Sequence, residues 1–201
     1  MRPTDRFPEL WICARRGLEG QSLSRLSSVY YYSKQATPCD PGGAEYEPAG
    51  WIRIFREPSR MPQNPFHPAE DATMVETCWL AHEYGHHLSK TRGTRTPEYE
   101  AALGVFSQFR APPHGVEVRC PTKAEQALIL SEESLAWSNG YSVLKDLRVT
   151  EWTEFEDECE RSLSNYRTTF QNMEKPDWGR VCADNAPASS EAPLEAADGT
   201  R

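Results

Sequence analysis

The sequence predicts an α+β fold in which a small twisted sheet packs on a helical body. Turn-forming residues divide the first third of the chain into short segments, two of which are rich in β-branched and aromatic residues. Beyond a proline-rich loop at 58–68, apolar residues recur every three or four positions, which is the spacing of helices that bury one face. The 201 residues, of which 38% are hydrophobic, are enough for one domain with a single core.

Two strands are expected in the first third, and a short helix at 10–16 precedes them. The segment 27–33 contains Val-Tyr-Tyr-Tyr, and the segment 51–55 reads Trp-Ile-Arg-Ile-Phe. We expect 51–55 to form an exposed edge of the sheet, because such an edge can pair with an extended peptide. Arg53 and Arg56 would then favour acidic or polar positions of that peptide.

Four long helices are expected after the loop. The first covers about 69–90 and ends at Gly93, a residue that favours the left-handed conformation of a helix terminus. The second opens at Thr96, a capping hydroxyl that is followed by proline in the first turn. The third covers about 121–147, and the fourth opens at Thr150. The apolar stripe of the fourth helix consists of Trp152, Phe155, Cys159, Leu163, Tyr166 and Phe170.

The composition indicates one domain at 1–182 and a disordered tail at 183–201. The tail consists mainly of Ala, Pro, Ser, Glu and Asp, with Leu194 as its one large apolar residue. It cannot bury enough apolar surface to offset its ordering entropy. No apolar run approaches the roughly 18 residues of a membrane span, and the start lacks the apolar segment of a secretory signal. We therefore expect a cytoplasmic protein with no membrane partner.

Charge and cysteine spacing disfavour two further classes of protein. The net charge is −8, and Lys and Arg are not gathered into a block, so no nucleic-acid partner is expected. The six cysteines are scattered, and no two of them stand in a C-x-x-C spacing. This pattern argues against a cysteine-rich zinc module.

The stretch His82-Glu83-Tyr84-Gly85-His86 carries the clearest chemical signal, and it lies inside an expected helix. Residues four apart share one helix face, so the imidazoles of His82 and His86 can reach one metal ion at about 2.0–2.1 Å. Glu83 lies beside that face and can take a proton from water without ligating the metal. Zinc would acidify the water and polarise a carbonyl, so the motif predicts a zinc metallopeptidase that hydrolyses peptide bonds.

A catalytic zinc site needs a third protein ligand, and the residues after His86 do not continue into a third histidine. A carboxylate from the helix at 121–147 is the alternative, and Glu132 and Glu133 are its candidates. The positions three and four residues from Glu133 are apolar, namely Ile129, Leu130, Ala136 and Trp137. A carboxylate in such a stripe is costly to bury unless a cation meets it. We favour Glu133 as the ligand, with Glu132 as the alternative.

The helix at 82–86 and the later Glu133-x-x-Ala136 together resemble the compact gluzincin metallopeptidases, and most of all the ImmA/IrrE type. The resemblance covers about 51–147. It implies a small cytoplasmic protease that acts on a selective protein or peptide substrate, such as a transcriptional regulator. The zinc ligands that it implies are His82, His86 and Glu133, and the base that it implies is Glu83.

This chain departs from the family pattern at Trp137, where the family has Asn or Asp, and in a helix-rich segment before Glu133. The alternative function is a catalytically silent zinc-binding module of the same fold, with an interaction or regulatory role. Glu83 argues against that alternative, because a purely structural site gains nothing from a base. Weaker candidates for a role at the site are His87, His114, Tyr141 and Cys78.

Overall fold

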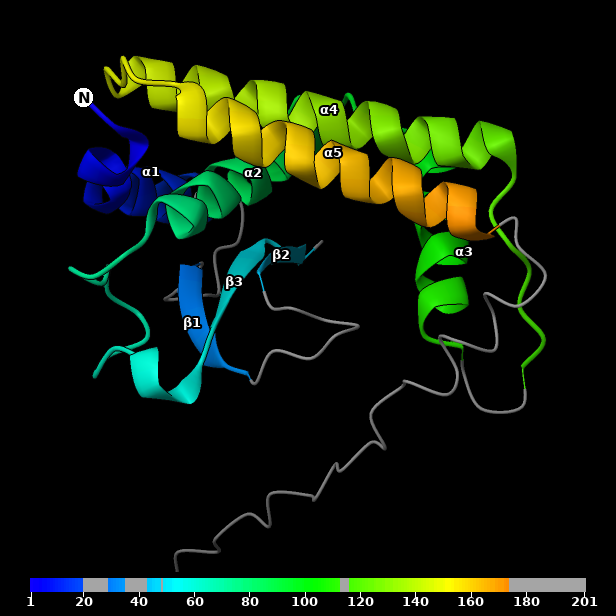
Figure 1. The fold of residues 1–201 in the computed structure, drawn as a ribbon, viewed down its shortest axis with the longest axis horizontal. Coiled ribbons are helices and arrows are strands. Elements are labelled where there is room, and N and C mark those ends of the chain that lie inside the picture. Colours follow the sequence, from blue (N-terminus) through cyan, green and yellow to red (C-terminus); the bar gives the residue numbers. More distant parts are fainter. Residues whose placement is uncertain (20–28, 35–42, 48, 113–115, 174–201) are drawn as a thin grey trace, which may run out of the picture.

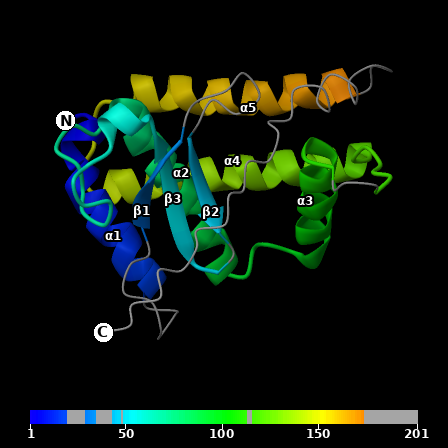
Figure 2. The same cartoon turned by 90° about the horizontal axis from the view of Figure 1, so that it is seen from below.

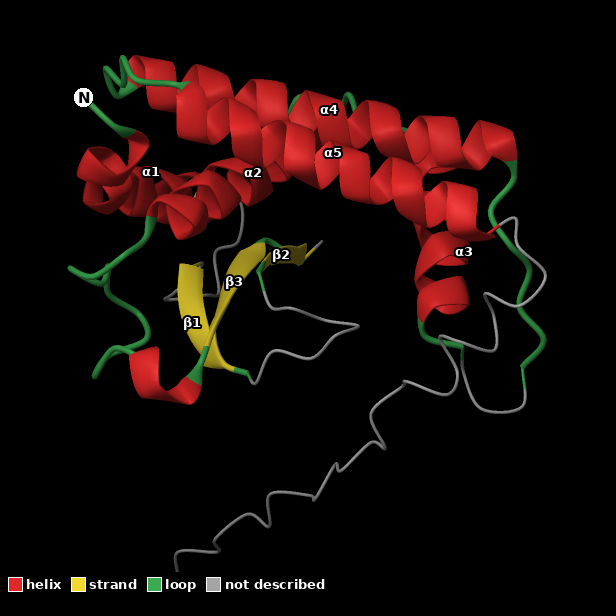
Figure 3. Cartoon of the chain, viewed as in Figure 1, coloured by secondary structure: helices red, strands yellow, loops and turns green. Residues whose placement is uncertain are grey.

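A computed structural model of the chain describes residues 1–19, 29–34, 43–47, 49–112 and 116–173 (Figure 1). Its α-helices and strands are α1 (Phe7–Glu19), β1 (Val29–Ser33), β2 (Ala44–Glu47), β3 (Trp51–Arg56), α2 (Met74–Thr91), α3 (Pro97–Arg110), α4 (Lys123–Asp146) and α5 (Thr153–Met173). Short 3-10 turns lie at Pro3–Arg6 and Pro58–Arg60. A small sheet packed against a helical body confirms the predicted α+β class (Figure 3). The expected tail and His114 lie outside the described residues.

The helices and the sheet form successive layers, with α2 in the middle. The sheet lies on one side of α2, and the long helices α4 and α5 lie on the other (Figure 1). Helices α1 and α3 stand at opposite ends of the molecule, as a second view also shows (Figure 2). Helix α2 therefore contacts both layers, and the side chains around its circumference can meet groups from each.

The sheet corrects the expectation for 51–55. Its strand order is β1-β3-β2, so β3 is the central strand, parallel to β1 and antiparallel to β2. Ile52 and Ile54 of β3 are fully buried, and the two outer positions belong to β1 and β2. The sequence Ala-Glu-Tyr-Glu of β2 alternates apolar and polar residues over only four positions, and alanine and glutamate are depleted in strands, which is why this strand was not predicted. Arg53 forms ion pairs with Glu45 and Glu47 of β2, so it does not face a free edge.

Capping residues set the helix ends. Helix α2 begins after Thr73, whose hydroxyl accepts the backbone N–H of Glu76 while the Glu76 carboxylate accepts the N–H of Thr73. The helix therefore starts later than the expected 69. Gly93 adopts a φ of 70° beyond its end, as a helix terminus requires. Thr96 caps α3 as expected. Helix α1 is longer than the expected 10–16, and α5 begins three residues after Thr150.

Two apolar clusters hold these layers together. The main cluster joins α1, the sheet, α2, the second half of α4 and the first half of α5, and it includes Trp11, Ile54, Leu80, Trp137 and Phe155. The smaller cluster joins α3 to the middle of α4 and the end of α5, and it includes Tyr99, Phe106, Ile129 and Phe170. The stripe expected on α5 thus serves both clusters. Among the described residues, no helix is long and apolar enough to cross a membrane.

Candidate metal centre

Two glycines allow α2 and α4 to pack with their backbones in contact. A Cβ atom at Gly85 of α2 would lie 1.9 Å from the carbonyl oxygen of Ala136, and a Cβ at Gly140 of α4 would lie 2.7 Å from that of Ala81. Both separations are shorter than van der Waals contact, so only glycine fits. The close approach brings the α2 residues around Gly85 against the middle of α4.

His82, His86 and Glu133 meet at this crossing. The Nε2 atom of His82 lies 3.2 Å from Oε2 of Glu133, and the Nε2 atom of His86 lies 3.6 Å from Oε1 of the same carboxylate. One ligand atom from each residue lies within 4.8 Å of the others, so this buried cluster could hold a metal ion. The structure thus brings together the three residues that the sequence proposes as ligands.

Burial makes the charges of this cluster depend strongly on one another. The side chains of His82, His86 and Glu133 are only 9%, 8% and 5% exposed. Burial would raise the pKa of Glu133, but His86 and His82 outweigh it and hold that pKa below its usual value. Burial would lower the pKa of His86, but Glu133 and Glu132 raise it to about 10. The buried imidazoles and carboxylates thus stabilise one another's charged forms.

Glu83 lies beside the cluster, on the side of α2 that faces the sheet. Its Oε1 atom is 3.9 Å from Nε2 of His82, and its side chain is 12% exposed. The backbone N–H of Tyr46 in β2 donates to its carboxylate. Burial raises the pKa of Glu83, whereas His82 and His86 lower it. A carboxylate so placed can exchange a proton with a group bound between the two imidazoles.

Glu132 also points inward, although its expected face is more polar than that of Glu133. Its side chain is 6% exposed, and its Oε1 atom lies 3.5 Å from Nδ1 of His86 and 3.8 Å from Nε of Arg95. The two adjacent carboxylates thus face different imidazole nitrogens. Arg95, in the short loop between α2 and α3, was not predicted as a site residue. Nothing in the sequence around it distinguishes it from a surface arginine.

The ring of His82 is held differently from that of His86. It stacks on Trp137 with a centroid separation of 4.4 Å and an interplanar angle of 25°. Its Nδ1 atom is buried and has no hydrogen-bond partner among the described residues. The residue that departs from the family pattern therefore packs directly on a candidate ligand.

The weaker candidates lie outside the cluster. His87 is buried between the Tyr46 hydroxyl, 3.3 Å from its Nδ1, and the backbone of Gly17. Tyr141 packs on Trp152 with a centroid separation of 4.1 Å. Cys78 is buried in the main apolar cluster, and burial raises its pKa to about 12. These contacts give all three residues a packing role.

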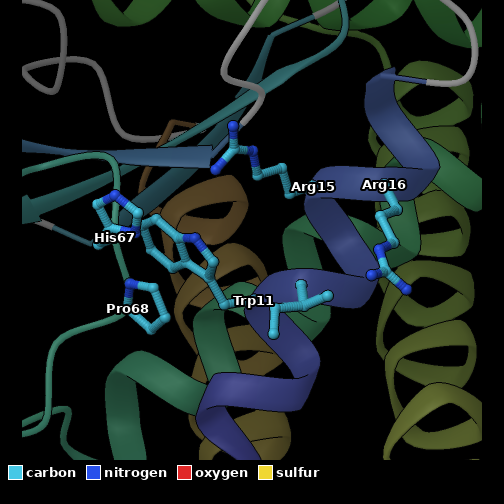
Figure 4. Close-up of a pocket in the computed structure, with 6 residues that line it drawn as sticks. Trp11, Arg15, Arg16, His67 and Pro68 are labelled. Atoms are coloured by element: carbon cyan, nitrogen blue, oxygen red, sulfur yellow. The ribbon is translucent and has the colours of Figure 1, made fainter.

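A separate hollow of about 410 Å³ lies against α1 (Figure 4). Its lining consists of Trp11, Ile12, Arg15, Arg16, His67 and Pro68. Figure 4 shows the Trp11 ring lying toward His67 and Pro68. The hollow contains none of the predicted ligands or the predicted base, so the candidate chemistry belongs to the α2–α4 crossing.

No protein-family model, curated protein or solved structure matches this chain. The resemblance to the gluzincins therefore rests on two short segments, the helix at 82–86 and the later Glu133-x-x-Ala136. These segments come from different parts of the sequence, and the fold places them in contact.

Proposed function

We propose that the protein is a zinc-dependent metallopeptidase that cleaves a selective protein or peptide substrate. One observation carries this proposal: the donors of His82, His86 and Glu133 converge in a buried cluster, and the carboxylate of Glu83 lies beside it. Two imidazoles and one carboxylate are a frequent ligand set of catalytic zinc, and three protein ligands leave a fourth position open. A structural zinc site, in contrast, fills all four positions with protein ligands.

The charges around the cluster fit a divalent cation. Glu83, Glu132 and Glu133 supply three carboxylates, and among the described residues the guanidinium that lies next to them is that of Arg95, beside Glu132. With neutral imidazoles, three negative charges and one positive charge leave a net charge of −2. Burying such an excess is unfavourable unless a cation balances it. The nitrogen and oxygen donors suit zinc, which also accepts imidazole more readily than magnesium or calcium does.

The residues around the metal position have distinct chemical roles. Zinc, when bound, supplies a Lewis acid that acidifies water and polarises the scissile carbonyl. The Glu83 carboxylate accepts the proton from the attacking water and returns it to the leaving amine. The N–H of Tyr46 fixes the orientation of that carboxylate. The low exposure of Glu83, 12%, keeps bulk water from competing for the proton.

The substrate is proposed to be a polypeptide, and β2 is the strand that lies next to the base. Strand β2 is one of the two outer strands of the sheet, and Tyr46 within it contacts both Glu83 and His87. This strand replaces 51–55 as the element along which an extended peptide would pair. A transcriptional regulator is the substrate class that the gluzincin resemblance implies.

The test compares wild type with Glu83→Gln in metal content and in proteolysis. Purified protein is expected to carry about one zinc per chain in both forms, by elemental analysis. Only wild type is expected to generate new N-termini when the two proteins are incubated with a whole-cell lysate and the termini are sequenced by mass spectrometry. General-base removal typically lowers a rate about 10²–10⁴-fold.

Two other outcomes would change the proposal. Equal cleavage by wild type and Glu83→Gln would show that Glu83 is not the base. Zinc in both proteins without cleavage in either would favour the catalytically silent zinc-binding module. The small exposed fractions of the ligands, 5–9%, are the structural feature that this second function would use, because a closed site keeps its metal.

A further inference from the structure

Glu132 is buried next to a candidate ligand without being one itself. Its Oε1 atom lies 3.5 Å from Nδ1 of His86, whereas Glu133 faces the other ring nitrogen, Nε2. Both atoms are buried, and neither has a well-oriented hydrogen-bond partner among the described residues. When Nδ1 of His86 carries a proton it is a hydrogen-bond donor, and the Glu132 carboxylate oxygen is an acceptor, so the two atoms can satisfy each other.

Arg95 lies beside Glu132, and its positive charge offsets the cost of burying that carboxylate. Its side chain is 5% exposed, and its Nε atom lies 3.8 Å from Oε1 of Glu132 and 3.2 Å from Oε1 of Glu100. The guanidinium also lies over the ring of Tyr99, 4.8 Å from the centroid, and 5.8 Å from that of Tyr46. Two aromatic rings and two carboxylates therefore fix its position.

A metal on Nε2 of His86 would complete this chain of contacts. Coordination at one imidazole nitrogen places the proton on the other, and a carboxylate that accepts this proton fixes both the tautomer and the ring orientation. His82 has no such acceptor among the residues that the structure describes, and its ring stacks on Trp137 instead. The two histidines thus differ in what orients them.

We propose that Glu132 is a positioning residue, which, held by Arg95, orients His86 toward the metal while Glu133 ligates it. The inference rests on the proposed metal centre and goes beyond it, because it gives the two adjacent glutamates separate roles. The proposed role also accounts for the position of α3. The loop before this helix places Arg95 beside Glu132, and the first turns of the helix place Tyr99 and Glu100 against Arg95.

The experiment measures zinc affinity by competition with a chromophoric chelator for wild type, Glu132→Gln, Glu133→Gln and Glu158→Gln. Loss of an acceptor behind a ligating histidine typically costs about 10–100-fold in metal affinity, which is the loss expected for Glu132→Gln. Glu133→Gln is expected to lose nearly all binding. Glu158→Gln is the matched control, because Glu158 is equally buried on α5 and contacts Trp79 and Arg161. It is expected to bind zinc like wild type.

Cobalt substitution separates positioning from general stability. The visible absorption of bound Co²⁺ reports the ligand field, so Glu132→Gln is expected to shift the bands of wild type, and Glu158→Gln is not. Arg95→Gln is expected to reduce zinc affinity in the same direction as Glu132→Gln, and Arg95→Lys, which keeps the charge, is expected to restore part of it.

Three results would overturn the inference. Wild-type zinc affinity and an unchanged cobalt spectrum in Glu132→Gln would show that Glu132 does not act on His86. Complete loss of metal in Glu132→Gln, equal to that in Glu133→Gln, would make Glu132 a ligand. An equal loss in Glu158→Gln would assign the effect to folding. Failure of wild type to bind zinc is a different result, because it removes the metal centre itself, and none of these measurements depends on proteolysis.

Discussion

Helix α2 carries two buried clusters of charge, and they differ in how completely the protein satisfies them. The first lies at the start of the helix, where Arg56 and Glu76 form two hydrogen bonds of 2.7 Å. Their side chains are 0% and 3% exposed. Arg56 also donates to Asp71 and to the carbonyl of Arg60, and Glu76 accepts the N–H of Thr73. Every charge in this cluster has a partner within the chain.

The second cluster lies in the middle of α2 and is incomplete. Three carboxylates lie in this cluster, and one of them, Glu132, contacts the Arg95 guanidinium. Buried atoms of His82, His86, Glu132 and Arg95 have no well-oriented hydrogen bond within the described part of the chain. A structural ion pair persists because its partners satisfy each other, whereas an unbalanced cluster requires a ligand of the opposite charge. The difference supports the middle of α2, and not its start, as the metal site that we propose.

The largest expected effect is loss of the metal from His82→Ala. Removing one of three converging donors leaves a two-ligand site, which binds zinc far more weakly. Zinc content by elemental analysis is expected to fall from about one per chain to nearly none. Arg56→Met is the comparison, because it damages the complete cluster and leaves the three donors untouched. Full zinc occupancy in His82→Ala would refute the assignment of this histidine.

The complete cluster is expected to dominate folding stability. Glu76→Gln leaves the Arg56 guanidinium buried without its carboxylate, which is expected to lower the free energy of unfolding by about 3–5 kcal/mol. Urea unfolding with and without a chelator measures this loss. We expect the same loss in both conditions, because the cluster needs no metal. A loss that appears only with zinc present would contradict the separation of the two clusters.

Chelation is expected to affect the incomplete cluster alone. A ligand that binds only the folded state stabilises it by about 2.7 kcal/mol when its free concentration is one hundred times the dissociation constant. For a domain of this size, removing zinc is then expected to lower the melting temperature by about 5–10 °C. Differential scanning calorimetry with added EDTA provides the measurement. Glu133→Gln serves as the control, since it should melt at the same temperature with and without EDTA.

The predictable part of this molecule consists of features encoded within a few residues. The histidine spacing, the threonine caps and the apolar stripe of α5 are local patterns, and the structure contains them. The side of α4 that faces α2 was also predictable, because Glu133 lies between apolar neighbours at helical spacing. These features are enough to locate the candidate metal cluster from the sequence alone.

The features that could not be predicted depend on contacts between distant segments. Strand β2 pairs with β3, but its four residues alternate apolar and polar side chains over too short a stretch, with two glutamates, to predict a strand by themselves. Arg95 reaches Glu132 only because the loop after α2 returns to α4. Glu132 can be buried for the same reason, because the positive charge of Arg95 offsets the cost of removing its carboxylate from water. Such contacts between distant residues cannot be recognised from local patterns in a single sequence.

The smallest effect expected tests the geometry of the crossing rather than its charges. In Gly85→Ala, the added Cβ would lie 1.9 Å from the carbonyl oxygen of Ala136, and helix backbone can move aside only by separating α2 from α4. Such overpacking typically costs about 1–3 kcal/mol. The separation would also withdraw His82 and His86 from Glu133, so zinc affinity should fall together with stability.

Gly104→Ala in α3 is the matched control for this last prediction. Its Cβ would meet no atom within 4 Å, and the position is exposed inside a regular helix. Alanine there is expected to stabilise the protein by about 0.5–1 kcal/mol, because it reduces the freedom of the unfolded chain. Urea unfolding and zinc competition on both variants decide the outcome. If Gly85→Ala kept wild-type zinc affinity, the ligands would not depend on the close approach of the two helices, and the crossing would serve packing alone.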